Sequence, residues 1–192
     1  MTSTATMQQR YPYQHLWPDT ARRPLLGFAA WSGTGKTTLL EAVIPRLRQA
    51  GTRVALVKHA HHDFDVDYPG KDSYELRKAG ADQVLVTSAE RWALIRERPA
   101  TRDPILAEEI ARLEQDSFDL LLVEGFRHER FPKIELLRDP GASASPLFRN
   151  DDAIIAVAAP DGLAMDTTLP RLSLDSPGMV ARFILEHIMQ AQ

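Results

Sequence analysis

The sequence predicts an α/β fold: a doubly wound, mostly parallel β-sheet with helices on both faces and an added β-hairpin. Three observations support this fold class. A strand-like apolar run, a segment with apolar residues at helical spacing and a second apolar run follow one another, as in a strand–helix–strand unit. A glycine-containing turn leads from the first strand into the helix. A later run of consecutive apolar residues ends in an acid, as expected for a buried parallel strand.

The turn after the first strand, residues 25–29, has the composition of a phosphate-binding loop. Gly33 and Gly35 allow positive φ angles and leave no side chain in the way, so consecutive backbone N–H groups can converge on phosphate oxygens. The helix that follows, to about Ala50 with Gly51 as its stop, adds the unpaired donors of its N-terminus. This context predicts a P-loop NTPase-like fold.

Two side chains complete the predicted loop. Lys36 can reach the terminal phosphates, and the Thr37 hydroxyl can ligate Mg²⁺. One position departs from the usual pattern, because Ala30 stands where a glycine normally opens the loop. The alternative is a strand-to-helix turn that binds nothing. The predicted phosphate-binding residues are Ser32, Gly33, Thr34, Gly35, Lys36, Thr37 and Thr38.

Length and composition narrow the function further. The chain has 192 residues, and we expect a flexible extension over 1–23 and one domain over 24–192. A net charge of −3 provides no electrostatic reason to expect nucleic acid or an anionic membrane as partner. The sequence has no cysteine, which fits a reducing compartment, and no apolar run of membrane-spanning length. We therefore expect a cytoplasmic protein.

The second candidate site follows the second predicted strand, residues 53–58. His59, His61, His62 and Asp63 come directly after it, where α/β sheets bind ligands. Three interpretations remain open: a role toward phosphate and Mg²⁺, a solvated polar loop, or a transition-metal site on the three histidines. Further along, Asp72 and Glu75 resemble a capping box for a helix ending near Lys78, with Asp65 and Asp67 before it.

The third candidate is Glu124, which ends the apolar strand of residues 120–123. Its carboxylate should emerge at the same edge of the sheet as the phosphate loop. In P-loop proteins an acid at this place holds Mg²⁺ or its water shell. The alternative is a glutamate that merely ends a strand.

The remaining elements are shorter. Asp161, in a turn after the last predicted strand at 153–158, could accept hydrogen bonds from the guanine N1 and amino groups, although turn aspartates are common. Asp103 and Pro104 are predicted to cap a helix carrying Leu106 and Ile110. The other predicted elements are a β-hairpin over 83–96 around Trp92, a strand at 132–138, a mobile loop at 139–150 and a helix beginning at Ser176–Pro177.

From Pro24 to the C-terminus the sequence resembles the MobB family of accessory proteins in molybdopterin guanine dinucleotide biosynthesis. The block from Val57 to Ala81 is the specific one, because phosphate loops occur across many functions. The family's loop also opens with alanine. The other supporting motifs are FAAWSGTGKTTLL at 28–40, RWAL at 91–94, LLVEGF at 121–126 and IIAVA at 154–158.

This resemblance implies a homodimeric, GTP-binding adapter with weak hydrolysis that acts beside a MobA-type guanylyltransferase, with molybdopterin as a further candidate ligand. It implies phosphate and Mg²⁺ contacts around Lys36 and Thr37, Glu124 near Mg²⁺, and a mobile phosphate-sensing or partner-binding loop at 61–63. Hydrolysis would need Lys36 to stabilise charge and a loop group such as Asp63 to position water. Guanine specificity rests on the family alone, because the sequence has no Asn-Lys-x-Asp motif.

Two other functions compete with this one. A small-metabolite kinase on the same fold would use Asp63 or Asp67 as the base for an acceptor hydroxyl. A pure interaction protein would bind nucleotide only as a structural or switching ligand. No arginine finger can be identified from the sequence, and Arg127 is the one candidate.

Overall fold

The computed structural model describes residues 10–60, 64–98, 102–138 and 145–191. The chain divides into a larger unit, residues 1–59 with 104–192, and a smaller unit, residues 60–103. Each unit is described by itself.

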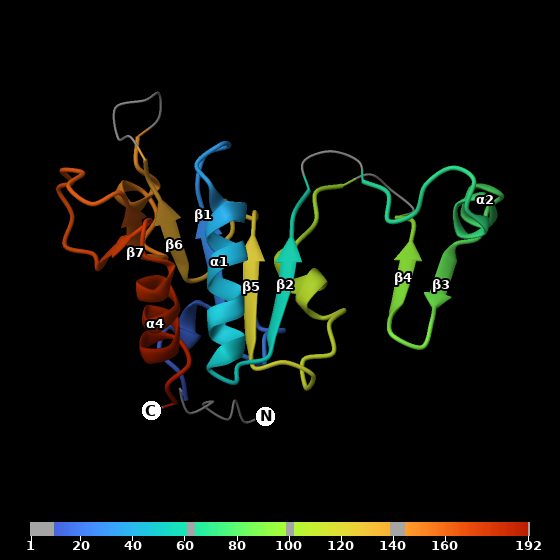
Figure 1. The fold of residues 1–192 in the computed structure, drawn as a ribbon, viewed down its shortest axis with the longest axis horizontal. Helices are drawn as coiled ribbons and strands as arrows, with labels where there is room; N and C mark the ends of the chain where they lie inside the picture. The colour runs from blue at the N-terminus through green and yellow to red at the C-terminus, as the bar shows by residue number, and fades with distance from the viewer. Residues whose placement is uncertain (1–9, 61–63, 99–101, 139–144, 192) are drawn as a thin grey trace, which may run out of the picture. The chain divides into compact units, whose positions relative to one another are not determined.

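The larger unit is built on a six-stranded sheet with the strand order β2-β5-β1-β6-β7-β8 (Figure 1). Every neighbouring pair in this sheet is parallel, as the predicted fold class requires. The strands are β1 (Leu25–Ala29), β2 (Val54–Lys58), β5 (Leu120–Glu124), β6 (Lys133–Leu136), β7 (Ile154–Ala159) and β8 (Arg171–Ser173).

Apolar side chains bury both faces of the sheet. In β5, Leu120 and Leu122 belong to one core cluster, whereas Leu121 and Val123 belong to another. Successive side chains of a strand point to opposite faces, so the continuous apolar run reflects cover on both sides. The first cluster lies under α1 (Lys36–Gln49) and α4 (Pro177–His187), which cross the same face in Figure 1. The second contains α3 (Leu106–Ile110).

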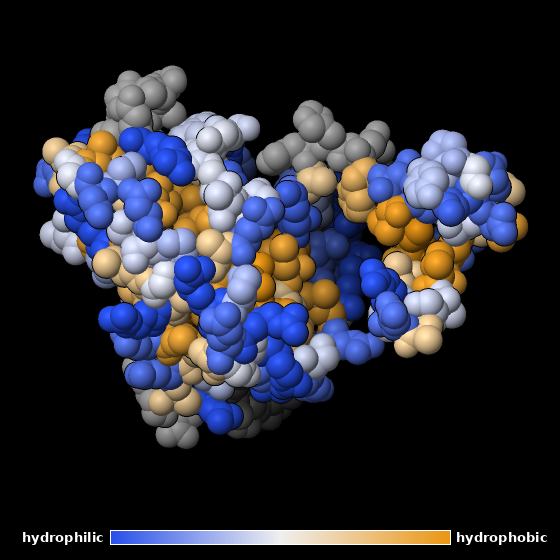
Figure 2. Space-filling model, in the orientation of Figure 1, coloured by the Kyte–Doolittle hydropathy of each residue, from blue (hydrophilic) through white to orange (hydrophobic). Residues whose placement is uncertain are grey.

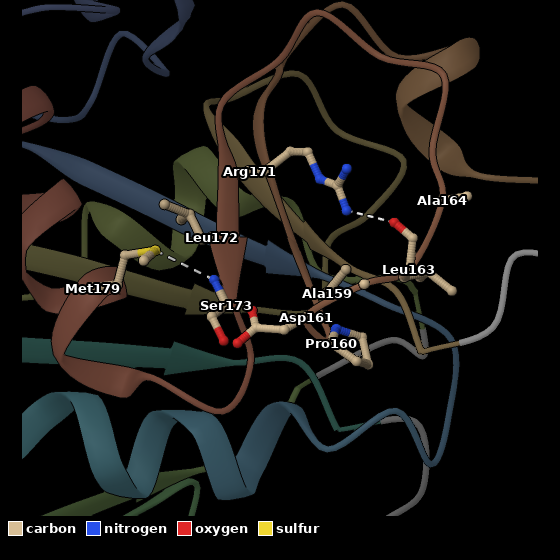
Figure 3. A pocket seen from close by; sticks show the side chains of 10 residues that line it. Ala159, Pro160, Asp161, Leu163, Ala164, Arg171, Leu172, Ser173 and Met179 are labelled. Carbon is tan, nitrogen blue, oxygen red and sulfur yellow. Dashed lines mark hydrogen bonds between the residues drawn. The ribbon is translucent and has the colours of Figure 1, made fainter.

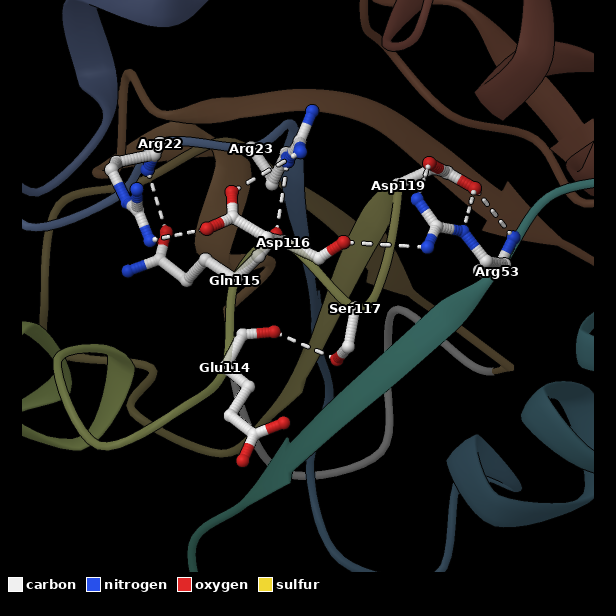
Figure 4. A network of polar contacts seen from close by, with 8 residues as sticks. All are labelled: Arg22, Arg23, Arg53, Glu114, Gln115, Asp116, Ser117 and Asp119. Atoms are coloured by element: carbon white, nitrogen blue, oxygen red, sulfur yellow. Dashed lines mark hydrogen bonds and ion pairs between the residues drawn. The ribbon is translucent and has the colours of Figure 1, made fainter.

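The N-terminal segment differs from the flexible extension predicted for residues 1–23. From Arg10 onward it is folded, with a 3₁₀ helix at Gln14–Leu16 and Leu16 almost completely buried. Gln115 fixes the end of this segment: its Oε1 accepts the Arg22 N–H at 2.7 Å and its Nε2 donates to the Thr20 carbonyl at 2.8 Å. Figure 4 shows this region, with Arg23 also donating to the Gln115 carbonyl.

The smaller unit consists of an antiparallel hairpin and a helix. The predicted hairpin is present as β3 (Gln83–Thr87) and β4 (Trp92–Arg96), with Thr87 opposite Trp92. The helix α2 spans Asp72–Lys78, as predicted. Trp92 is 60% exposed.

Arg77 of α2 is the ionic centre of the smaller unit. Its side chain is almost fully buried, and its guanidinium forms ion pairs of 2.6 Å with Asp65, Asp67 and Glu97. Three carboxylates around one arginine satisfy a charge that would otherwise be costly to bury.

Two predicted helix caps differ in the structure. Asp72 is the first residue of α2 rather than its cap, and the Glu75 carboxylate accepts the Gly70 N–H at 3.2 Å instead. For α3, the predicted cap at Asp103 is wrong. Ile105 takes the N-cap position, and Glu129, far away in sequence, accepts the Leu106 N–H at 2.9 Å.

A further difference lies at the C-terminal end of the sheet. The strand β7 was predicted to be the last one, but β8 extends the sheet by pairing parallel to it. Another short 3₁₀ helix spans Leu147–Arg149. The helix α4 begins at Pro177 after Ser176, as predicted, and its residues Val180, Phe183 and Ile184 are buried. Among the described residues, no helix has both the length and the apolar character needed to cross a bilayer.

Candidate functional site

Three neighbouring strands end at the same level and define the candidate site. In the sheet register, Phe28 of β1 lies beside Glu124 of β5, which in turn lies beside Lys58 of β2. The phosphate loop begins two residues after Phe28. Glu124 therefore emerges at the carboxyl edge next to the loop, as predicted.

The loop has the backbone that its glycines predict. Gly33 and Gly35 have φ angles of 78° and 97°, in the region that favours glycine. Gly35 occupies the N-cap position of α1, so the donors at the start of this helix face the loop. Ala30 has no positive φ and is buried in the core beneath α1, which explains why alanine suits the first position.

Lys36 folds back over the loop. Its Nζ donates to the carbonyls of Ala30 at 3.0 Å and Trp31 at 3.4 Å. Burial lowers the pKa of the Lys36 ammonium below its ordinary value; Glu124 opposes this shift, while the charges of Arg127 and Lys58 add to it. A phosphate anion would relieve the repulsion among these cations.

Glu124 is available to a cation at the same edge. Its side chain is only 13% exposed, and its Oε2 lies 3.4 Å from the Nζ of Lys58, which is itself largely exposed. Thr37 lies in the exposed first turn of α1. A hydroxyl and a carboxylate are the hard oxygen donors that Mg²⁺ prefers, so the residues present fit that ion.

The histidine segment is only partly described. His61, His62 and Asp63 lie outside the described residues, so their predicted roles stay predictions. His59 lies against the site: its N–H donates to the Glu124 carbonyl at 2.8 Å, and its ring centroid is 4.9 Å from that of Phe126. The described residues contain no group of three or more His, Cys, Asp or Glu side chains arranged to hold a metal.

Asp67 is engaged within the smaller unit. The hydrogen bond from Arg77 lowers the pKa of the Asp67 carboxyl, and the side chain is 7% exposed. A carboxylate held in this way is a weak base with little access to an acceptor hydroxyl. This finding weakens the kinase interpretation as far as Asp67 is concerned.

Asp161 lines a cavity of about 400 Å³ at the carboxyl ends of β7 and β8 (Figure 3). Ser173 and Arg171 come from β8, and Arg171 donates a hydrogen bond to the Leu163 carbonyl across the cavity. Figure 3 shows the Asp161 carboxylate on the side of Ser173. The sequence singled out Asp161 but not the cavity, because β8 was not predicted.

Comparisons with known proteins identify the family. The family model described as "Molybdopterin guanine dinucleotide synthesis protein B", or MobB, matches residues 25–160. The chain belongs to the MobB family. It is 49% identical over 163 residues to the molybdopterin-guanine dinucleotide biosynthesis adapter protein of Escherichia coli K12, covering 85% of this chain and 92% of that protein. The adapter protein of Haemophilus influenzae is 41% identical, with 84% and 87% covered.

Solved structures agree with this assignment. A MobB protein homologue from Bacillus stearothermophilus matches with a TM-score of 0.63 and 26% identity, covering 84% of this chain and 94% of that chain. The MobB family match includes the phosphate loop and Glu124 and stops one residue before Asp161. The folded segment from Arg10 to Arg23 also lies outside it.

Two arginines next to the loop add to the predicted site. The guanidinium carbon of Arg127 lies 4.7 Å from the centroid of the Trp31 ring. Arg138, which follows β6, donates from Nε to the Thr34 carbonyl at 2.8 Å. Sequence reasoning named Arg127 only as a candidate and missed Arg138. Arg127 follows β5 and Arg138 follows β6, and both strands neighbour β1 in the sheet. This strand order cannot be read from the sequence, so nothing in the sequence indicated that Arg138 reaches the loop.

Proposed function

We propose that this MobB-family protein is a cytoplasmic GTP-binding adapter in molybdopterin guanine dinucleotide biosynthesis that works beside a MobA-type guanylyltransferase. Relatives at 49% and 41% identity carry the adapter name. The observation that supports nucleotide binding best is the placement of Lys36 and Glu124 together at the loop edge, with burial and neighbouring charges acting on Lys36.

The proposed nucleotide extends from the loop to the Asp161 cavity. The backbone N–H groups of residues 33–38 and the Lys36 ammonium would bind the phosphates. The Asp161 carboxylate would accept hydrogen bonds from guanine N1–H and the exocyclic amino group. Adenine lacks both donors at these positions, so one carboxylate in the cavity discriminates between the two bases.

Mg²⁺ would be held by Thr37 and Glu124 together with phosphate oxygens. When bound, the ion neutralises the phosphate charge that Lys36 alone cannot balance. Lys58 forms an ion pair with Glu124 in the structure, and Mg²⁺ would have to displace it from the carboxylate. Such competition is feasible because the Lys58 side chain is 54% exposed and a divalent ion attracts the Glu124 carboxylate more strongly than one ammonium does.

Hydrolysis would be slow in this proposal. Asp63, His61 or His62 is the predicted group for positioning water, and molybdopterin is a further proposed ligand of the protein. Without a partner's arginine, turnover on the order of 10⁻⁴ to 10⁻² per second is expected for such a site.

The smaller unit supports a role in protein–protein contact. Figure 2 shows apolar surface over β3 and β4. Contiguous exposed apolar patches are typical of interaction sites. The proposed partners for this surface are a second copy of the chain, forming a homodimer, and the guanylyltransferase. The exposed apolar residues of the smaller unit's elements are Leu85, Trp92 and Leu94 on one face of the hairpin, Val86 on the other face, and Leu76 on α2.

A calorimetric titration with non-hydrolysable GTP and ATP analogues, each with and without Mg²⁺, tests the proposal. The wild type should bind the guanine analogue preferentially and depend on Mg²⁺. The Lys36→Ala variant should bind either nucleotide at least about 10-fold more weakly, because a charged hydrogen bond to phosphate is lost. Preference for the ATP analogue would overturn the guanine assignment and favour the kinase. Binding of neither would remove the nucleotide from the proposal.

The Asp161→Asn variant tests the base cavity. It should reduce the preference for guanine by about 10-fold or more, because the amide cannot accept both donors. Asp166→Asn is the matched control, since Asp166 is an exposed residue of the same segment that does not line the cavity.

Retained partner binding by nucleotide-free Lys36→Ala protein would favour the pure interaction protein.

A further inference from the structure

The turn after β5 directs Arg127 toward the phosphate loop. Gly125 and Phe126 both have positive φ angles, 95° and 52°, which bend the chain sharply after Glu124. A side chain at Gly125 would collide with His59, because its Cβ would lie 2.6 Å from the His59 Cβ. The turn therefore fits closely, and the next residue, Arg127, lies over the ring of Trp31 in the loop.

Among the described residues, the charges that act on the Lys36 ammonium are mainly positive. The positive charges of Lys58 and Arg127 act on the positively charged Lys36 ammonium. Glu124 supplies the negative charge that opposes them. Terminal phosphate oxygens near Lys36 would compensate this excess. The guanidinium of Arg127 is suited to this role because its planar donors match the geometry of phosphate oxygens.

The backbone of Arg127 is anchored while its side chain is exposed. The fully buried Lys133 donates from Nζ to the carbonyls of Arg127 at 3.3 Å and Glu129 at 2.6 Å. Arg127 itself contacts the Trp31 ring face and donates from Nε to His128 at 3.1 Å. An exposed cation–π contact is weaker than a charge-assisted bond to phosphate, so a bound anion can recruit the guanidinium with little rearrangement of the backbone.

Arg138 differs in a way that provides a comparison. Its Nε is committed to the Thr34 carbonyl, and its Nη2 lies 3.1 Å from the point where a Cβ on Gly35 would stand. It therefore braces the loop backbone itself. Loss of Arg138 should affect any ligand of the loop, whether diphosphate or triphosphate.

We propose that Arg127 is the residue with which this chain recognises the terminal phosphate of a nucleoside triphosphate, so that it distinguishes triphosphate from diphosphate. The inference rests on the proposed nucleotide binding and names the group that contacts the terminal phosphate. In an adapter, a difference in affinity between triphosphate and diphosphate determines which nucleotide the loop holds.

The test compares binding of GDP and of a non-hydrolysable GTP analogue by calorimetry with Mg²⁺ present. Arg127→Ala should weaken binding of the triphosphate analogue by about 10-fold or more and change GDP binding less than about 2-fold, because one charge-assisted contact to the terminal phosphate is lost. Arg127→Lys should recover part of the loss. Arg130→Ala is the matched control, since Arg130 lies in the same segment but pairs with Asp152, and it should leave both affinities unchanged.

Equal weakening of GDP and triphosphate binding by Arg127→Ala would overturn the proposal, because it would indicate a general effect on the loop, the result expected for Arg138→Ala. Unchanged binding of both would overturn it as well. In either case a wild type that binds GTP leaves the proposed function standing. A wild type that binds neither nucleotide refutes both. If Arg127→Ala fails to fold, Arg127→Gln provides the same comparison.

Discussion

At the scale of single residues, Lys133 is a buried charge that contacts the segment carrying Arg127. Its side chain is 1% exposed, and its Nζ contacts Asp151 at 2.8 Å and two backbone carbonyls. These oxygens compensate for the desolvation of the ammonium, and they fix the segment that carries Arg127. One buried lysine thus links the stability of the fold with the geometry of the site.

Replacing Lys133 with Met should lower the free energy of unfolding by about 3 kcal/mol, because the Asp151 carboxylate and two carbonyls lose their donor. Chemical denaturation at neutral pH measures this change. Arg130→Ala is the control, because the Arg130–Asp152 pair is exposed and should contribute much less to stability. Equal losses in the two variants would contradict the importance assigned to burial.

The Arg53–Asp119 pair predicts a pH effect. Hydrogen bonds from Arg53 hold the pKa of the Asp119 carboxyl at about 2, below its ordinary 3.8 (Figure 4). Because the folded-state pKa is the lower one, the carboxylate stabilises the fold above about pH 4, and this contribution disappears as the pH falls from about 4 to about 2.

Asp119→Asn should therefore destabilise the protein by about 1 kcal/mol at pH 7, the value reduced for the partial exposure of both side chains, and by much less at pH 2. Denaturation curves across this pH range measure the difference. Asp116→Asn, at a 79% exposed side chain in the same network, serves as the control. A constant difference between wild type and Asp119→Asn at all pH values would refute the assignment.

At the scale of elements, β1 depends on a glycine for packing rather than for backbone conformation. A Cβ on Gly27 would lie 2.3 Å from Phe131 Cε2 and 2.9 Å from Lys133 Cγ. The strand that leads into the phosphate loop can therefore approach Phe131 closely only without a side chain at this position.

Gly27→Ala should destabilise the protein by about 2 kcal/mol or more through overpacking, and it should reduce nucleotide binding at the adjoining loop. Thermal denaturation and calorimetry measure the two effects. Gly178→Ala is the matched control: this helical glycine has open surroundings, with Arg46 Nε 3.9 Å from the added Cβ, so alanine should be neutral or stabilising by up to about 1 kcal/mol. A tolerated Gly27→Ala would show that Phe131 can move aside.

At the scale of the whole molecule, the folded N-terminal segment extends the larger unit beyond the MobB family match. Leu16 is buried, and Trp17 packs against the second core cluster with α3. Gln115 and the Ala107 carbonyl, which accepts the Thr20 hydroxyl at 2.7 Å, tie the segment to the unit.

A chain beginning at Arg22 should be less stable than one beginning at Arg10 by about 2 kcal/mol or more, because it exposes the surface that Leu16 and Trp17 cover. Thermal denaturation of the two truncated proteins measures this difference. Lower stability should appear without a change in the ratio of GDP to GTP-analogue affinity. Equal melting temperatures would mean that the segment does not contribute to stability.

Elements with strong local signals could be predicted from the sequence. The strands β1, β2, β5 and β7 are continuous apolar runs, and the helices α1 and α4 have apolar residues at helical spacing. The three-residue β8 escaped prediction because only Leu172 and its polar neighbours form it. The hydrogen bond between the Leu106 N–H, at the start of α3, and the Glu129 carboxylate could not be predicted either, because the two residues lie 23 positions apart in the sequence.

The sequence by itself determined the phosphate loop, the parallel sheet and the MobB resemblance, because backbone preference and apolar periodicity are properties of adjacent residues. Only the tertiary structure decided which distant side chains meet there. Arg127 and Arg138 reach the loop because β5 and β6 flank β1, and the Asp161 cavity exists because β8 adds to β7. Strand order depends on the packing of the whole core, which no single segment encodes.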